Sequence, residues 1–183
     1  MTLNYKKKIK GIYYAPGDKS ISHRALILTS QAVGKSEISN LLEGEDVLNT
    51  LKAMRALGAK IKKNGNKYIV FGLPPGSLFQ PQKPIDFGNS GTGIRLLSGL
   101  ISSNDIKIKL VGDKSLSKRP MRRVTDHLEK IGATFILRNN LFLPIQIQGV
   151  GDAIPLKYNI KIPSAQIKSS IMLSALNTNG RVA

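Results

Sequence analysis

The sequence feature that most constrains the fold of this chain is an internal repeat with a period of about 74 residues. The segments that begin at Leu51 and Val124 share one pattern: an amphipathic stretch, a Gly-Ala pair, an alternating stretch, an Asn-containing turn and a second alternating stretch. This pattern predicts a helix followed by two strands. Gly58 and Gly132 stand 74 residues apart at the same point of the pattern, just after the predicted helix, where glycine is favoured.

Further helix and strand patterns precede both copies, and these helices are predicted to begin near Ser20 and Ser90. A complete unit therefore reads strand-helix-strand-helix-strand-strand, and the alternation predicts an α/β fold in which helices cover a sheet. Ser164 stands 74 residues after Ser90 and predicts the first helix of a third unit. The predicted units span about residues 14–83, 84–157 and 158–183.

The third unit has only about a third of the residues of the other two. We therefore expect two whole units and the start of a third, in a chain that is a fragment of a longer protein. The alternative is a short natural capping unit. The last four residues, "GRVA", favour the fragment because they read as the beginning of a strand whose apolar edge would be left uncovered.

The composition excludes several classes of site. The 183 residues include no cysteine, which excludes disulfides and thiolate metal sites, and two histidines that stand far apart in the sequence. We therefore expect no metal site. No segment has the roughly 18 uninterrupted apolar residues of a membrane span, and no apolar stretch of signal-peptide length follows the basic N-terminus. We expect a cytoplasmic protein with no membrane partner.

The formal net charge of +17 is the strongest signal in the composition. Such a surplus is typical of proteins that bind nucleic acid, membrane surfaces or anionic small molecules. Many lysines alternate with apolar residues, as in "KIKGI" and "IKIKL", which is the pattern of the solvated face of a strand. The chain has no tryptophan, so aromatic platforms for single-stranded nucleic acid are in short supply. We expect no nucleic-acid partner, and the loops described next favour anionic small molecules.

Three junctions between a loop and a helix recur at the same point of each unit: "PGDKSISHR", "FGNSGTGIR" and "IPSAQIKSS". The N-terminus of a helix presents free N–H groups and the positive end of the helix dipole, so it attracts anions. Because the junctions are equivalent in the repeat, we expect them to line one anionic cleft. The alternative is that Ser20 and Ser164 are ordinary N-caps and the glycines ordinary turn residues. The side chains placed to reach an anion are Lys19, Arg24, Asn89, Thr92, Arg95, Ser164, Gln166 and Lys168.

The tetrapeptide "GDKS" occurs at residues 17–20 and again at 112–115, but the two copies stand at different points of the repeat. The second copy leads into "KRPM", where Arg119 precedes a proline suited to the first turn of a helix. A guanidinium there could pair with a carboxylate or phosphate.

Several other features are expected to be structural. "AVGKS" lacks the first glycine of a phosphate-binding P-loop, and "GNSGTG" has its glycines in the wrong order for a dinucleotide fingerprint. His23 is expected to be a partly buried helix residue and His127 a solvated one.

Five of these motifs together resemble the 5-enolpyruvylshikimate-3-phosphate synthase family of 3-phosphoshikimate 1-carboxyvinyltransferases. They are "PGDKSISHRALIL", "LLEGEDVLNTLKAMRALGA", "DFGNSGTGIRLLSG", "GDKSLSKRPM" and "SAQIKSSIMLSALNT", and they cover nearly the whole chain in order. The resemblance implies the enolpyruvyl transferase fold, an inside-out α/β barrel in which each of two domains has three such units and the active site lies between the domains. Residues 14–183 would then form most of the first domain, and residues 1–13 would associate with the second.

The resemblance also implies roles for individual residues. Lys19, Ser20, Arg24, Ser164, Ala165 and Gln166 would contact shikimate-3-phosphate; Lys19, Gly91, Arg119 and Gln166 would contact phosphoenolpyruvate; Asn89, Thr92 and Arg95 would shape the phosphoenolpyruvate pocket. Position 165 is alanine where many family members carry serine, so a hydroxyl contact is absent there.

The reaction implied is transfer of the enolpyruvyl group from phosphoenolpyruvate to the 5-hydroxyl of shikimate-3-phosphate, without cofactor or metal, by a protein that is monomeric at full length. Both substrates carry a phosphate and a carboxylate, so their approach requires a preorganised cationic site. The resemblance implies that the groups that transfer protons lie in the second domain, and we see no equivalent carboxylate at the loops described above. The alternatives are an enolpyruvyl transferase that acts on a UDP-sugar, and a basic module that binds nucleic acid.

Overall fold

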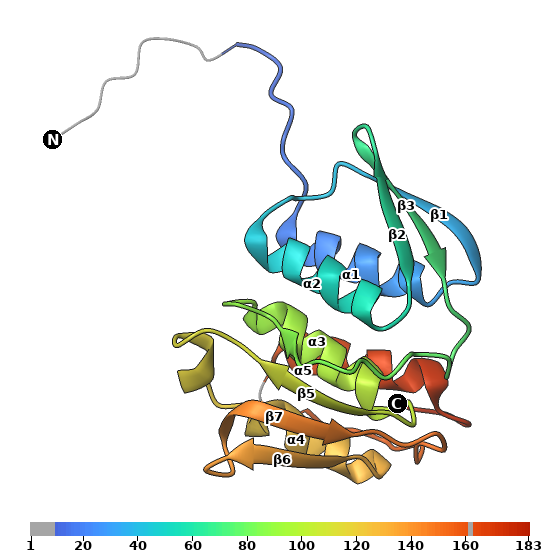
Figure 1. Ribbon diagram of the computed structural model, residues 1–183, viewed down its shortest axis with the longest axis vertical. Coiled ribbons are helices and arrows are strands. Elements are labelled where there is room, and N and C mark those ends of the chain that lie inside the picture. The colour runs from blue at the N-terminus through green and yellow to red at the C-terminus, as the bar shows by residue number, and fades with distance from the viewer. Residues whose placement is uncertain (1–9, 161–162) are drawn as a thin grey trace, which may run out of the picture.

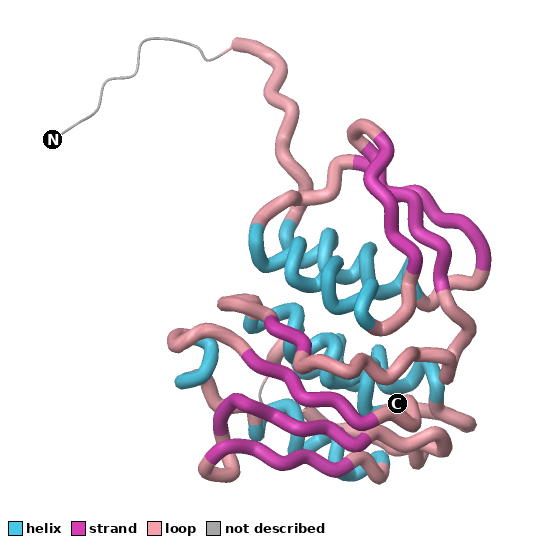
Figure 2. Tube along the Cα trace, in the orientation of Figure 1, coloured by secondary structure: helices cyan, strands magenta, loops and turns pink. Residues whose placement is uncertain are grey.

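The structure is a computed structural model that describes residues 10–160 and 163–183 (Figure 1). Most of the segment predicted to associate with a second domain, residues 1–13, lies outside the described residues. Two sheets, a three-stranded antiparallel one and a four-stranded mixed one, lie on the outside of the molecule, and the helices lie between them (Figure 2). In the described part of the chain, no helix combines the length and the apolar character needed to cross a membrane.

The first unit contains two helices and a three-stranded sheet. Its elements are α1 (Lys19–Ser30), β1 (Gly34–Ser39), α2 (Glu45–Ala56), β2 (Lys60–Asn64) and β3 (Lys67–Gly72). The strand order is β1-β3-β2, and both pairs are antiparallel. Gly58 follows α2 with a φ of 106°, a conformation that glycine adopts without strain. "AVGKS" runs into β1, in agreement with its rejection as a P-loop.

The second unit repeats this arrangement and adds one strand. Its elements are β4 (Ile85–Asp86), α3 (Gly91–Ser102), β5 (Lys107–Val111), η1 (Leu116–Lys118), α4 (Arg122–Leu128), η2 (Glu129–Ile131), β6 (Thr134–Arg138) and β7 (Phe142–Gln148), where η marks a 3₁₀-helix. The order β5-β7-β6 matches β1-β3-β2, and β4 pairs in parallel with β5. Gly132 has a φ of 103°, nearly that of Gly58. The repeat predicted from sequence is therefore confirmed in its topology.

The third unit contributes α5 (Ala165–Ser174) and η3 (Ala175–Asn177). The strand expected around Tyr158 is not formed at residues 158–160. Two backbone bonds nevertheless join this segment to Ala183: the Tyr158 N–H donates to the Ala183 carbonyl at 2.6 Å, and the Ala183 N–H donates to the Leu156 carbonyl at 3.1 Å. This is the bonding pattern of a parallel pair, and it resembles the β4–β5 pair of the second unit.

The strand predicted at the start of the first unit is wrong for the described residues 10–18, which form no regular element. Ile12, Tyr13 and Tyr14 are each more than 80% exposed, and the segment extends away from the body of the molecule (Figure 1). A strand requires a neighbour for its backbone N–H and C=O groups. β4 has such a neighbour in β5, whereas no strand in the described residues lies beside 10–18.

Helix α3 forms the centre of the core. All of its residues are buried except Thr92 and Arg95, both of them predicted site residues. It packs against α1, α2, α4 and α5. A methyl carbon on Gly99 would lie 2.0 Å from the carbonyl oxygen of Ser170, so α3 and α5 approach each other at backbone distance. The sheets carry the exposed lysines: Lys60 and Lys62 flank buried Ile61, as the alternating pattern predicted.

Candidate functional site

The site is built where helices begin. In Figure 1, α1, α2 and α3 all begin on the left of the view and run to the right, so their N-termini lie at one end of the molecule. Hydrogen bonds between side chains join the N-terminal halves of α1 and α3 to α5. The junctions predicted from the repeat are therefore close together.

The start of α1 corrects one detail of the sequence interpretation. The N-cap is Asp18, whose carboxylate accepts a hydrogen bond from the Ile21 N–H at 2.7 Å, and Ser20 is already in the first turn. The two candidates compete because both can accept from an N–H two or three residues ahead. This places Lys19 at the first helical position, where its side chain is exposed.

Arg24 lies one turn into α1 and reaches across to α5. Its Nη1 donates to the Ser20 carbonyl at 3.0 Å, and its Nη2 donates to the Ser169 hydroxyl at 2.9 Å. The guanidinium thereby joins the N-terminal half of α1 to α5.

The start of α3 is the most tightly constrained of the three. Ser90 is the N-cap and accepts from the Gly93 N–H at 3.2 Å. Gly91 lies directly beneath two arginines: a methyl carbon built on it would lie 3.0 Å from Arg119 Nη1 and 3.1 Å from Arg95 Nη1. Glycine at this position therefore leaves room for both guanidinium groups above the helix terminus.

Arg119 follows the 3₁₀-helix η1, and its side chain contacts the loop that precedes α3. Its Nη2 donates to Asn89 Oδ1 at 2.5 Å and to the Ser115 hydroxyl at 3.4 Å. The carboxylate of Asp113 accepts from the Leu116 N–H at 2.6 Å and fixes the start of η1. The second "GDKS" copy thus forms the turn that presents Arg119, and Asn89 and Arg119 are in contact as expected for one pocket.

The start of α5 meets α3 through one glutamine. Ser164 is the N-cap and accepts from the Ile167 N–H at 3.4 Å. Gln166 donates to Thr92 Oγ1 at 3.1 Å and accepts from Arg95 Nη1 at 2.9 Å. Gln166 and Thr92 are separated by 74 residues, so the bond joins equivalent positions of two units. Ala165 is exposed beside them.

The electrostatics of this cluster favour an anion. Burial lowers the pKa of Arg95, and the positive charges of Arg119 and Arg123 lower it further. Among residues 10–160 and 163–183, no carboxylate forms a salt bridge with Arg24, Arg95 or Arg119. Like charges held together in this way are stabilised by an anionic ligand.

Two charged residues near the site were missed by the sequence interpretation. Asp46 Oδ2 lies 3.1 Å from Lys19 Nζ, although no carboxylate was expected at these loops. The acidic residues at the start of α2, within "LEGED", were the sequence signal for a carboxylate near the site. Arg123, in the first turn of α4, acts on Arg95 through its charge.

The histidines differ from expectation in degree. His23 is fully buried rather than partly buried. His127 was expected to be solvated, but it is half-buried, with its ring edge-on to Tyr158 at a centroid distance of 6.0 Å. The aromatic contact, made across 31 residues of sequence, was invisible in the charged sequence around His127.

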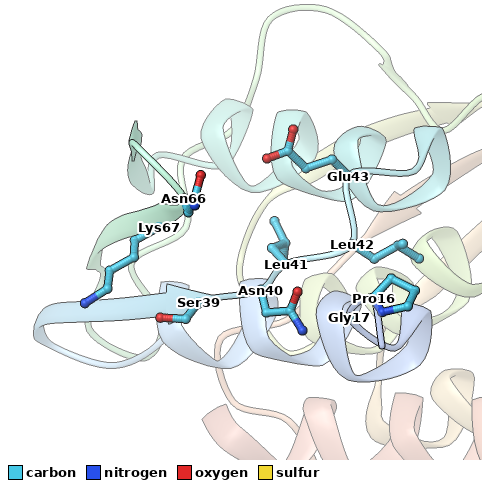
Figure 3. A pocket seen from close by; sticks show the side chains of 9 residues that line it. All are labelled: Pro16, Gly17, Ser39, Asn40, Leu41, Leu42, Glu43, Asn66 and Lys67. Atoms are coloured by element: carbon cyan, nitrogen blue, oxygen red, sulfur yellow. The ribbon is translucent and has the colours of Figure 1, made fainter. Parts of the chain in front are cut away.

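A cavity of about 520 Å³ lies near the start of α1 but outside this cluster (Figure 3). Pro16 and Gly17 form one side, residues 39–43 the base, and Asn66 and Lys67 of the β2–β3 hairpin the other side. None of the predicted site residues lines it. The polar cluster is instead an open surface, because Lys19, Ser20, Asn89 and Ala165 are exposed.

Comparisons with known proteins point to one family. The sequence model of EPSP synthase (3-phosphoshikimate 1-carboxyvinyltransferase) matches residues 3–183. The chain is 47% identical over 182 residues to the 3-phosphoshikimate 1-carboxyvinyltransferase of Ruegeria sp. (strain TM1040), covering 99% of this chain and 40% of the relative. It is 51% identical over 168 residues to that of Granulibacter bethesdensis, covering 91% of this chain and 37% of the relative.

The fold is also found in solved structures. The structure of EPSP synthase from Acinetobacter baumannii matches with a TM-score of 0.88 and 37% identity, over 93% of this chain and 39% of that chain. This chain thus spans about two fifths of the length of the relatives it matches. On this sequence match and this shared fold, the chain belongs to the EPSP synthase family, the 3-phosphoshikimate 1-carboxyvinyltransferases.

Proposed function

We propose that this chain supplies the first-domain part of the active site of an enzyme that transfers the enolpyruvyl group of phosphoenolpyruvate to the 5-hydroxyl of shikimate-3-phosphate. The observation that carries the proposal is the cationic cluster around Gly91, where Arg95 and Arg119 lie together without a carboxylate partner in the described residues. Family membership supports the same reaction, since the matched relatives are named for it.

The reaction requires such a cluster on physical grounds. The 5-hydroxyl oxygen forms a bond to C2 of phosphoenolpyruvate, the bond from C2 to the phosphate oxygen breaks, and inorganic phosphate leaves. Each substrate carries a phosphate and a carboxylate, so four anionic groups must enter one cleft. Preorganised cations and helix N-termini offset the repulsion, because their charges and dipoles are already oriented.

The site divides into two parts in this proposal. Shikimate-3-phosphate lies between α1 and α5, in contact with Lys19, Ser20, Arg24, Ser164, Ala165 and Gln166. Phosphoenolpyruvate lies over the start of α3, in contact with Lys19, Gly91, Arg119 and Gln166. The hydrogen bonds of Arg24 to α5 and of Gln166 to α3 support this division, because each already spans the gap its ligand would occupy.

Asn89, Thr92 and Arg95 hold the contact residues rather than the ligands. Asn89 orients Arg119, and Thr92 and Arg95 hold the two ends of the Gln166 amide. These hydrogen bonds already direct the Arg119 and Gln166 side chains toward the proposed substrate positions. A bound substrate would displace or share them.

The remaining expectations belong to the whole protein and stand as part of the proposal. Residues 14–183 form most of a first domain, and residues 1–13 associate with a second that carries the proton-transfer groups. The enzyme is cytoplasmic and monomeric, needs no metal or cofactor, and does not bind nucleic acid. A UDP-sugar substrate is less well supported, because the matched relatives are named for 3-phosphoshikimate.

The test is a hybrid enzyme. This chain, joined to the remaining part of the Ruegeria sp. relative, is expected to release phosphate from phosphoenolpyruvate only when shikimate-3-phosphate is present. The 183-residue chain alone is expected to bind shikimate-3-phosphate without turnover. A folded hybrid that is inactive with shikimate-3-phosphate but active with a UDP-sugar would replace the proposal. A steep loss of DNA affinity with rising salt, in place of any binding of shikimate-3-phosphate, would favour the nucleic-acid alternative.

A further inference from the structure

Helices α1 and α2 are joined by two polar contacts placed one helical turn apart. Lys19 Nζ lies 3.1 Å from Asp46 Oδ2, and His23 Nδ1 lies 2.8 Å from Thr50 Oγ1. Both contacts span 27 residues of sequence, so they form successive rungs between two parallel faces. The upper rung is exposed at the candidate site, and the lower rung is buried beneath it.

The lower rung leads back to the upper one through α2. The Thr50 hydroxyl also lies 3.4 Å from the Asp46 carbonyl oxygen, to which it can donate. His23 therefore donates from Nδ1 to Thr50, and Thr50 donates to the backbone of Asp46, whose carboxylate pairs with Lys19. This assigns the Nδ1–H tautomer to His23. Its Nε2 is buried and makes no hydrogen bond to the described residues, which suits an unprotonated nitrogen better than an N–H group.

Thr50 also sets the distance from these two contacts to α3. A methyl carbon on Gly93 would lie 2.5 Å from Thr50 Oγ1, so the hydroxyl touches the first turn of α3 just below Gly91. His23, Thr50 and Gly93 thus form a buried junction where α1, α2 and α3 meet. A shift of α1 along α2 would break the lower rung and move Lys19 relative to the α3 cations.

We propose that His23 is a positioning residue for Lys19: the buried hydrogen bond from His23 to Thr50 fixes α1 against α2, so that Lys19 is presented to an anionic substrate at the right distance from α3. The inference rests on the proposed function for the identity of the anion. It assigns His23 no contact with substrate and no part in proton transfer. Neither residue of this rung was assigned a role from the sequence.

The charges that act on His23 are known from each neighbouring helix. Asp46 of α2 favours the protonated imidazole, whereas Lys19 and Arg24 of α1 oppose it. Burial is the largest effect and lowers the pKa of His23 to about 4, so the imidazole is neutral at neutral pH.

Two variants of the 183-residue chain separate positioning from simple packing. His23→Leu combined with Thr50→Val removes both polar partners and keeps apolar volume, which is close to neutral for stability. His23→Asn places an amide where Nδ1 stood, and so keeps a hydrogen bond to Thr50 without a titrating ring. We expect the double variant to unfold at the wild-type temperature within a few degrees at pH 7, yet to bind shikimate-3-phosphate about tenfold more weakly. We expect His23→Asn to stay within about threefold of wild type.

A second readout does not need the substrate. The ¹⁵N signals of His23 should show the Nδ1–H tautomer, and the Nζ-bearing methylene of Lys19 should report its contact with Asp46 in wild type and His23→Asn but not in the double variant. A folded double variant with wild-type affinity and an unchanged Lys19 signal would overturn the inference. If the wild-type chain binds no shikimate-3-phosphate, the proposed function fails, and the Lys19 signal alone decides the role of His23.

Discussion

Helices α1 and α3 begin at equivalent points of the repeat but support the site in different ways. α3 is buried everywhere except at Thr92 and Arg95, and Gly91 brings its terminus close beneath two arginines. α1 is open at its start, where Lys19, Ser20 and Ile21 are exposed and Lys19 is paired to an acid on α2. The repeat therefore determines the backbone path. Side-chain size and burial determine whether the start of a helix is closely packed, as in α3, or carries an exposed charged side chain, as in α1.

The comparison predicts, first, that α1 and not α3 makes the fold sensitive to acid. Burial lowers the pKa of His23 from 6.5 to about 4. The unfolded chain takes up this proton near pH 6.5, so the stabilisation is fully present above that pH and is lost as the pH falls from 6.5 to 4. We expect a loss of about 3 kcal/mol in the free energy of unfolding.

Urea unfolding of wild type and His23→Asn between pH 7 and 4 measures this loss. Carboxylates titrate in both proteins, so the difference between the two curves isolates His23. Parallel curves would show that α1 carries no such sensitivity.

The second prediction concerns the close approach of α3 to α5. Gly99→Ala forces a methyl group to 2.0 Å from the Ser170 carbonyl oxygen, and the helices must separate. We expect a loss of about 2 kcal/mol, because overpacking exceeds the helix preference gained by alanine. Thermal unfolding provides the measurement.

Gly151→Ala is the matched control, since its new methyl would meet only Asp105 Cβ at 3.7 Å. Equal stability of the two variants would mean that α3 is not the rigid element of the comparison.

Third, Arg95→Leu should weaken binding of phosphoenolpyruvate and shikimate-3-phosphate by about tenfold, or roughly 1.4 kcal/mol, because Gln166 loses the donor that orients it. Calorimetric titration of the 183-residue chain measures both affinities. Lys62→Leu removes the same charge from the outer face of β2 and is expected to change either affinity less than twofold. A comparable loss in both variants would indicate general attraction by net charge.

The smallest expected effect concerns Lys19, the exposed charged residue at the start of α1. Asp46→Asn removes the half-buried partner of the exposed Lys19, so the free energy of unfolding should fall by no more than about 0.5 kcal/mol. Affinity for shikimate-3-phosphate should rise two- to threefold, since Lys19 is released and a negative charge is removed. Weaker binding in this variant would show that Asp46 holds Lys19 in place for the substrate.

The parts of the fold that depend on local chemistry were predictable from sequence. Gly58 and Gly132 mark helix ends because their backbone requires a positive φ, and this preference belongs to the residue itself. The lysines that alternate with Ile61 likewise predicted an outward strand face. The three site junctions followed from the same repeat.

The parts of the fold that depend on contacts with neighbouring segments were not predictable from sequence. The repeat predicted a strand before the first helix, but a strand exists only where another strand satisfies its backbone, and residues 10–18 have no such neighbour in the described part of the chain. The contacts of Asp46 with Lys19 and of His23 with Thr50 each join positions 27 residues apart, and no local pattern determines which residues of two helices will face each other. Family resemblance named the expected ligand contacts and the residues around them, but neither of these two interactions.

The near-complete burial of α3 has a consequence for how this protein can vary. Ten of its 12 positions are closed to change without repacking of neighbouring helices, so sequence drift on this helix is confined to Thr92 and Arg95. These two positions adjoin the proposed phosphoenolpyruvate site. A library randomised along α3 should therefore return folded variants almost solely with changes at Thr92 and Arg95. The positions that tolerate substitution are then the same ones at which ligand preference can change.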